Sequence, residues 1–142
     1  MSDPLYAKDL LRLAANAVGA GRLQPCDAEG DAHNPTCGDR VSVTLRLDER
    51  KNISAIAHET SACVLAQASA SILGAHLAGA DRAAVERLRA DVAAMLREGK
   101  TPPAPFADFV TLAGAAAYRN RHSCVLLPID AVLDALSKDG SS

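Results

Sequence analysis

The sequence predicts a mostly helical protein that also contains an antiparallel β-hairpin. Alanine and leucine dominate the apolar residues of the 142-residue chain, which has no Trp, two Tyr and two Phe. Such a composition favours helices packed closely through small side chains. Residues 41–48, in contrast, alternate between apolar and polar side chains, the two-residue period of a half-buried strand. A second strand is expected over residues 53–59, after the polar turn 48–52, and the two strands would form the hairpin.

Size and charge narrow the possible classes of protein. A chain of 142 residues that is 49% apolar can bury one core but has little room for another, so we expect one domain over residues 1–142. The formal charge of −2, with both signs mixed along the chain, provides no basic patch for nucleic acid. No apolar run approaches a membrane span and the N-terminus does not resemble a signal peptide, so a cytoplasmic protein with no membrane or nucleic-acid partner is expected.

The sequence of the N-terminal third predicts one helix, followed by a segment without a clear apolar pattern. Apolar residues within 5–18 lie on one broad face at helical spacing, and Gly19 and Gly21 supply a stop signal. Residues 22–33 are polar and include a proline and a glycine. At best, this segment predicts an irregular edge strand.

Two helices are expected after the hairpin. The first begins near Cys63 and ends within residues 74–79, where glycines interrupt the apolar pattern. The second is capped by Asp81 and ends at Gly99, with apolar residues every three or four positions between them. Residues 100–105 contain three prolines, which predict a loop.

The C-terminal region predicts a short helix near Phe109 and a last helix through residues 126–136. Pro128 is tolerated most easily in the first turn of a helix. The last helix is therefore expected to start just after Cys124.

The cysteines are the residues whose neighbours suggest chemistry. In a reducing compartment, four cysteines serve metal binding, nucleophilic chemistry or simple burial. Residues 33–39 form a turn-like sequence directly before a strand. Gly38 can adopt a positive φ, so the Cys37 sulfur and the Asp39 carboxylate could point at the same ion.

Cys63 and Cys124 are both expected near helix N-termini, where the helix dipole favours the thiolate. Three thiolates and a carboxylate suit tetrahedral zinc, and they could equally supply the terminal ligands of a two-iron cluster. A carboxylate holds these metals less firmly than a thiolate, which suits a carrier. However, the cysteines are far apart and form no C-x-x-C pair, so spacing alone leaves metal binding and burial as small hydrophobic residues equally favoured.

Three ordered motifs resemble the U-type iron–sulfur cluster assembly scaffolds, the family of IscU, SufU and the NifU N-terminal domain. They are residues 34–40 (Asn-Pro-Thr-Cys-Gly-Asp-Arg), the segment Cys63-x3-Gln-Ala-Ser-Ala-Ser, and Leu112-x-Gly-x3-Tyr-x2-Arg-x2-Cys124. The third motif is similar to the SufU branch. The resemblance covers nearly the whole chain.

The resemblance implies an α+β fold with a small three-stranded antiparallel sheet packed against several helices. It implies that Cys37, Asp39, Cys63 and Cys124 are the ligands of a metal or a cluster. It also implies that residues of about 80–105 are a helical insertion typical of SufU-type members. In that branch the site usually holds zinc and the cysteine matching Cys124 accepts sulfur from a cysteine desulfurase; in the IscU branch it assembles a transient [2Fe-2S] cluster.

Three hypotheses follow from the resemblance. The favoured one is a non-enzymatic scaffold or carrier that receives sulfur from a cysteine desulfurase and passes a [2Fe-2S] cluster to apo iron–sulfur proteins or carrier proteins. The second is a zinc-dependent sulfurtransferase in which Cys124 accepts persulfide sulfur and Arg121 steadies developing negative charge. The third is a divergent member with a structural metal site only.

Some residues depart from the family pattern or lie outside it. Ala62 replaces the usual glycine before the second cysteine, and the Leu-Pro-Pro-Val-Lys chaperone signal of the IscU branch is absent, so the partner surfaces are expected to differ. Cys26 matches no family ligand and is interpreted as an incidental thiol. His122, two residues before Cys124, is interpreted as solvent-facing rather than as an alternative ligand.

Overall fold

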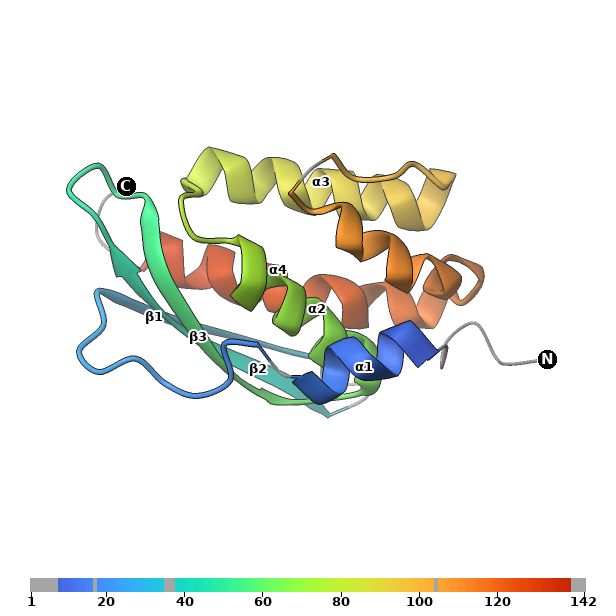
Figure 1. Ribbon diagram of the computed structural model, residues 1–142, viewed down its shortest axis with the longest axis horizontal. Helices are drawn as coiled ribbons and strands as arrows, with labels where there is room; N and C mark the ends of the chain where they lie inside the picture. Colours follow the sequence, from blue (N-terminus) through green and yellow to red (C-terminus); the bar gives the residue numbers. More distant parts are fainter. Residues whose placement is uncertain (1–7, 17, 35–37, 104, 139–142) are drawn as a thin grey trace.

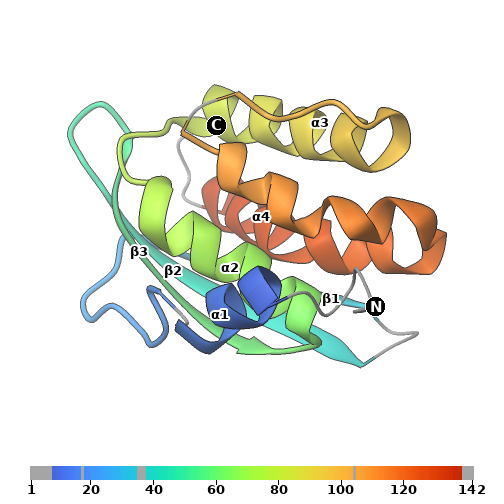
Figure 2. The same ribbon diagram turned by 45° about the vertical axis from the view of Figure 1, so that its right-hand side comes forward.

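The fold combines a three-stranded antiparallel sheet with helices that cover one of its faces. The computed structural model describes residues 8–16, 18–34, 38–103 and 105–138. In chain order the elements are α1 (Lys8–Asn16), β1 (Ala28–Asn34), β2 (Asp39–Leu47), β3 (Ile53–Ser61), α2 (Val64–His76), α3 (Arg82–Glu98), the 3-10 helices η2 (Ala107–Ala117) and η3 (Arg119–Arg121), and α4 (His122–Ser137). Figures 1 and 2 show α2 and α4 across one face of the sheet and α3 on the far side of these two helices. The α+β class is confirmed.

The sheet has the strand order β1-β2-β3. The inward-facing side chains of β2, Val41, Val43 and Leu45, are fully buried, as their alternation with polar residues predicted. Residues 48–52 form the turn between β2 and β3, closed by a hydrogen bond from the Asp48 N–H to the Asn52 carbonyl at 2.9 Å. The predicted hairpin is therefore confirmed.

Strand β1 is more regular than the sequence predicted. It pairs with β2 along its whole length, although its buried positions carry only the small residues Ala28 and Gly30 instead of large apolar side chains. The reason is its contact with α4: a Cβ at Gly30 would overlap the backbone of Ala135, so only glycine fits there. On the unpaired edge of β1, the Asp31 N–H donates to the Asp134 carboxylate at 2.9 Å. Helix α4 therefore buries the inner face of β1, which has no large apolar side chains. It also supplies the hydrogen-bond acceptor that a neighbouring strand would otherwise supply.

Helix α3 begins and ends where the sequence predicted. The Asp81 carboxylate accepts a hydrogen bond from the Ala84 N–H at 2.8 Å, a capping contact that satisfies a free N–H of the first turn. At the other end, Gly99 adopts the left-handed conformation with φ of 77° and donates to the Met95 carbonyl at 2.9 Å.

The prediction that the last helix starts after Cys124 is wrong. Helix α4 begins at His122, so Cys124 lies in its first turn and Pro128 lies inside the helix. Proline cannot donate to the carbonyl four residues earlier, that of Cys124. The helix continues because the residues around the proline are buried and because the Ser69 hydroxyl of α2 donates to the neighbouring Val125 carbonyl at 2.7 Å. Within the described ranges, no helix has both the length and the apolar content needed to cross a bilayer.

The chain after α1 pairs with the outer edge of β3. The His58 N–H donates to the Gly19 carbonyl at 2.9 Å and the Gly21 N–H donates to the His58 carbonyl at 2.8 Å. The His58 ring lies within hydrogen-bond distance of the Val18 carbonyl and the Thr60 hydroxyl, both at 2.9 Å. Burial lowers the pKa of His58, which favours the neutral ring at neutral pH. His58 is therefore a structural residue.

We predict that Gly30→Ala lowers the free energy of unfolding by about 3 kcal/mol, because the added methyl group meets backbone that cannot move aside without shifting α4. The matched control is Glu29→Ala on the opposite face of the same strand, where the side chain is exposed and forms only a surface ion pair with Arg22. It is expected to cost less than about 1 kcal/mol. Urea denaturation with excess chelator measures both. Equal losses would contradict the assigned packing of β1 on α4.

Candidate metal centre

Three of the four predicted ligands meet at one end of the sheet. Asp39 is the first residue of β2, Cys63 precedes α2 as its N-cap residue, and Cys124 lies in the first turn of α4. One ligand atom from each side chain lies within 4.8 Å of the other two. Asp39 and Cys124 are buried, whereas Cys63 is half-buried. Three segments that are distant in sequence thus contribute to one cluster of metal-binding groups.

The fourth predicted ligand, Cys37, lies outside the described residues, but the residues on either side of the segment 35–37 are described. Asn34, the last residue of β1, pairs with Asp39 at the start of β2. The Gly38 N–H donates to the Asn34 carbonyl at 2.8 Å, and Gly38 has a φ of 73°. The positive φ was predicted from the glycine. These backbone contacts of Asn34 with Gly38 and Asp39 hold the start of β2 in place.

Two side-chain contacts that the sequence did not reveal support the site. The Asn34 amide donates to the Ser123 hydroxyl at 3.0 Å, which joins the end of β1 to the first turn of α4. The Gln67 amide donates to the Ala62 carbonyl at 2.9 Å, which fixes the peptide directly before Cys63. The first contact joins residues that are 89 positions apart in the sequence, whereas the second is local and lies at the start of α2.

The electrostatics of Cys124 differ from the prediction. Its thiol lies 3.5 Å from Asp39 Oδ2 and donates to it. Burial raises the pKa of Cys124 to about 12, with a further contribution from the neighbouring Cys63 and Asp39. The expectation that the helix start would favour the thiolate is therefore wrong for the metal-free protein, because loss of solvent outweighs the helix dipole. A cation among the three groups would reverse this balance.

The donor set fits zinc or the iron of a cluster. Zinc binds thiolate sulfur at about 2.3 Å in a tetrahedron, so its sulfur ligands lie about 3.8 Å apart. The separations of up to 4.8 Å among the atoms of Asp39, Cys63 and Cys124 need only a small contraction to reach that geometry. Two thiols and a carboxylate leave one tetrahedral position for a fourth ligand.

A cavity of about 490 Å³ opens beside Asp39. On the outer face of the sheet, Arg40 lies opposite His33 of β1 on one side and opposite Ser61 of β3 on the other, and all three residues line this cavity. Asp39 therefore borders this cavity, Cys63 is the most exposed of the three described ligands, and Cys124 is fully buried.

The other residues named from the sequence lie around the site or away from it. Arg121 precedes α4 and is half-buried, as is His122, the first residue of the helix. Cys26 lies before β1, at the end of that strand opposite the cluster, and belongs to no group of three described metal-binding side chains.

Known proteins resemble this chain in sequence and in fold. Residues 5–125 match the family described as "NifU-like N terminal domain". The chain is 30% identical over 112 residues to the iron–sulfur cluster assembly scaffold protein IscU of Streptococcus pyogenes serotype M1, covering 78% of this chain and 69% of that protein.

Two crystal structures have the same fold. The N-terminal domain of a nitrogen-fixing NifU-like protein from Brucella abortus superposes with a TM-score of 0.87 at 33% identity, covering 95% of this chain and 94% of that one. A protein described as a putative iron–sulfur cluster assembly scaffold of the SUF system, from Fervidobacterium islandicum, superposes with a TM-score of 0.81 at 20% identity, covering 96% and 99%. The second likeness shows the fold alone.

We predict that Cys63→Ser and Cys124→Ser each weaken zinc binding by about 100-fold or more, because each removes a thiolate from a four-ligand site. Cys26→Ser is the matched control, since it removes a thiol far from the cluster, and should bind zinc as the unaltered chain does. Competition titration against a zinc-binding dye measures all three. The assignment fails if Cys26→Ser weakens binding as much as the other two substitutions do.

Proposed function

The chain belongs to the NifU-like N-terminal domain family of iron–sulfur cluster assembly scaffolds, and from this premise we propose that it holds a labile [2Fe-2S] cluster or zinc at Cys37, Asp39, Cys63 and Cys124. One observation carries the proposal: ligand atoms of Asp39, Cys63 and Cys124 lie within 4.8 Å of one another. Cysteines that are buried only for packing are expected among apolar side chains rather than beside a buried carboxylate. A buried carboxylate is costly without a polar or metal partner.

The arrangement of the donors suits a cargo that must leave. Asp39 binds iron or zinc less firmly than the thiols do, and it borders the open cavity. Exchange of the cargo is therefore expected to begin at Asp39, while buried Cys124 holds on longest. The high pKa of Cys124 in the metal-free protein makes return of a proton to this thiol favourable when the cargo departs.

The proposal includes partners that supply and receive the cargo. A cysteine desulfurase would supply sulfur, and apo iron–sulfur proteins or carrier proteins would receive the cluster in the cytoplasm. In this account the chain is a non-enzymatic scaffold of one domain. Helix α3 (Arg82–Glu98) lies within the segment of about 80–105 that is similar to the SufU-type insertion.

A zinc-dependent sulfurtransferase is the second candidate, because a mixed site of thiolates and one carboxylate also suits zinc. Cys124 would then accept sulfur, with Arg121 near the start of the same helix in support. The Cys124 side chain is fully buried, so this role requires it to leave the metal and become accessible when the donor binds. A purely structural metal is the third reading.

Reconstitution tests the proposal. Anaerobic incubation with iron, cysteine, a cysteine desulfurase and a thiol reductant, which reduces the persulfide sulfur to sulfide, should give the charge-transfer absorption of a [2Fe-2S] cluster. Cys63→Ser should abolish it because a terminal ligand is lost, and Cys26→Ser should behave as the unaltered chain. After an apo ferredoxin is added and the two proteins are separated, the absorption should be found with the ferredoxin, since the cluster moves to the recipient.

The same mixture distinguishes the alternatives. If no cluster forms but the zinc-loaded chain accelerates the desulfurase and Cys124→Ser does not, the sulfurtransferase is correct and the scaffold is wrong. If neither effect occurs and the substitutions only lower the melting temperature, the metal is structural.

A further inference from the structure

The outer edge of β3 already forms backbone hydrogen bonds with two other segments of the chain, residues 79–80 and residues 19–21. At one end, the Ile53 N–H donates to the Ala80 carbonyl at 2.8 Å and the Gly79 N–H donates to the Ile53 carbonyl at 2.7 Å. Further along, residues 19–21 pair with His58 in a parallel bridge. The outward backbone groups of this edge therefore form hydrogen bonds with other segments at Ile53 and His58. At the end of the strand, around Thr60, no such bond is formed within the described residues.

Thr60 is the uncovered position of this edge that lies nearest to Cys63. Residues of an edge strand point their N–H and C=O groups alternately toward the neighbouring strand and outward. Because His58 bonds outward to residues 19–21, the N–H and C=O of Thr60, two residues later, also point outward. Within the described ranges no backbone group pairs with them on that side. The side chain of Thr60 bonds only to the His58 ring, so one backbone donor and one acceptor are available for a partner.

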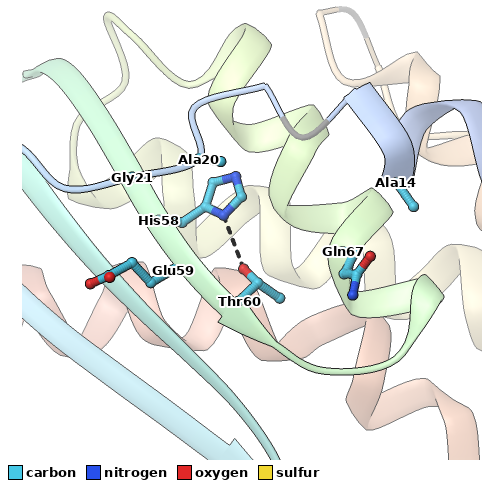
Figure 3. A pocket seen from close by; sticks show the side chains of 7 residues that line it. All are labelled: Ala14, Ala20, Gly21, His58, Glu59, Thr60 and Gln67. Carbon is cyan, nitrogen blue, oxygen red and sulfur yellow. Dashed lines mark hydrogen bonds between the residues drawn. The ribbon is translucent and has the colours of Figure 1, made fainter.

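A cavity of about 440 Å³ adjoins this position. Figure 3 shows His58 and Thr60 on the strand, with Ala14 of α1 and Gln67 of α2 across from them. The small side chains of Ala14 and Ala20 leave room for a side chain of a bound peptide. Among the described lining residues Glu59 is the single permanently charged one, and it forms an ion pair with Arg22, so a neutral segment is favoured over a strongly charged one.

The cavity is connected to the metal centre through two residues. Gln67 lines the cavity and also donates to the Ala62 carbonyl, directly before Cys63. Thr60 is three residues before Cys63, so the two lie within about 10 Å even along a fully extended chain. A peptide bound at Thr60 would bring its own side chains close to the candidate metal centre.

We propose that the edge of β3 at Thr60 and the adjoining cavity bind an extended peptide segment of the cysteine desulfurase by strand addition, in the parallel direction that residues 19–21 already use. This inference rests on the proposed function. The sulfur donor is the favoured partner because sulfur carried on a cysteine side chain moves no further than that side chain reaches, so the donor backbone must come near Cys63. Main-chain hydrogen bonds supply affinity in this mode, and the cavity supplies selectivity.

A matched pair of substitutions tests the backbone contact. Thr60→Pro removes the outward N–H without breaking the β2–β3 ladder, and proline is tolerated on a sheet edge. Thr60→Val keeps that N–H and the β-branched shape while losing the same hydroxyl. Binding of the purified cysteine desulfurase from the same organism should be about fivefold weaker with Thr60→Pro than with Thr60→Val, the effect of one hydrogen bond.

Two further measurements keep the test decisive if Thr60→Pro disturbs folding. Ala20→Leu, which fills the cavity, should also weaken binding of the desulfurase, while zinc binding by Ala20→Leu and Thr60→Val stays unchanged. Hydrogen exchange of residues 57–62 should slow when the desulfurase is added.

Several results would overturn the proposal. The first is equal binding of the desulfurase by the two Thr60 variants when both are folded, and the second is unchanged hydrogen exchange at residues 57–62. The third is a loss of self-association rather than of desulfurase binding, because the edge would then be an interface between copies of this chain. If the unaltered chain binds neither zinc nor a cluster while Thr60→Pro still selectively weakens desulfurase binding, the proposed function fails and the docking site stands.

Discussion

The close packing of α4 on β1 is the contact on which the rest of the structure depends. Gly30 lets the helix approach so closely that any side chain there would overlap the Ala135 backbone, and Asp134 of the same helix satisfies the Asp31 N–H on the open edge of the strand. This contact sets the position of Cys124 along the sheet. A slip of α4 by one turn, about 5.4 Å, would exceed the 4.8 Å separation that keeps Cys124 with Asp39 and Cys63.

The site that results from this packing is asymmetric. Cys124 is fully buried and Cys63 half-buried, while Asp39 borders a cavity of about 490 Å³. The ligand that binds the metal least firmly therefore borders a cavity, Cys63 is the most exposed of the three, and Cys124 is the most protected from solvent. Such an arrangement favours exchange of a cargo over permanent retention, which supports a scaffold more than an electron carrier.

The parts of the fold that local signals determine were predicted well. Helix α3 has both predicted ends because Asp81 and Gly99 act through contacts within a few residues, and β2 follows its own alternation. Strand β1 was underestimated because α4, about a hundred residues away in sequence, supplies its burial. The start of α4 was misplaced because the cost of Pro128 inside a helix is outweighed by burial and by the hydrogen bond from Ser69.

The meeting of Asp39, Cys63 and Cys124 was expected from the family motifs, whereas the part of Cys37 in the site stays a prediction. The raised pKa of Cys124 depends on its depth in the fold, which its position near a helix start did not indicate. The contact of Asn34 with Ser123 requires the tertiary structure, because the two residues are 89 positions apart in the sequence.

X-ray absorption at the zinc edge, measured on the zinc-loaded protein, tests the central claim most directly. A site of Cys37, Asp39, Cys63 and Cys124 predicts three sulfur atoms at about 2.3 Å and one oxygen at about 2.0–2.2 Å. A shell dominated by nitrogen and oxygen, or four sulfur atoms including that of Cys26, would contradict the assigned ligand set.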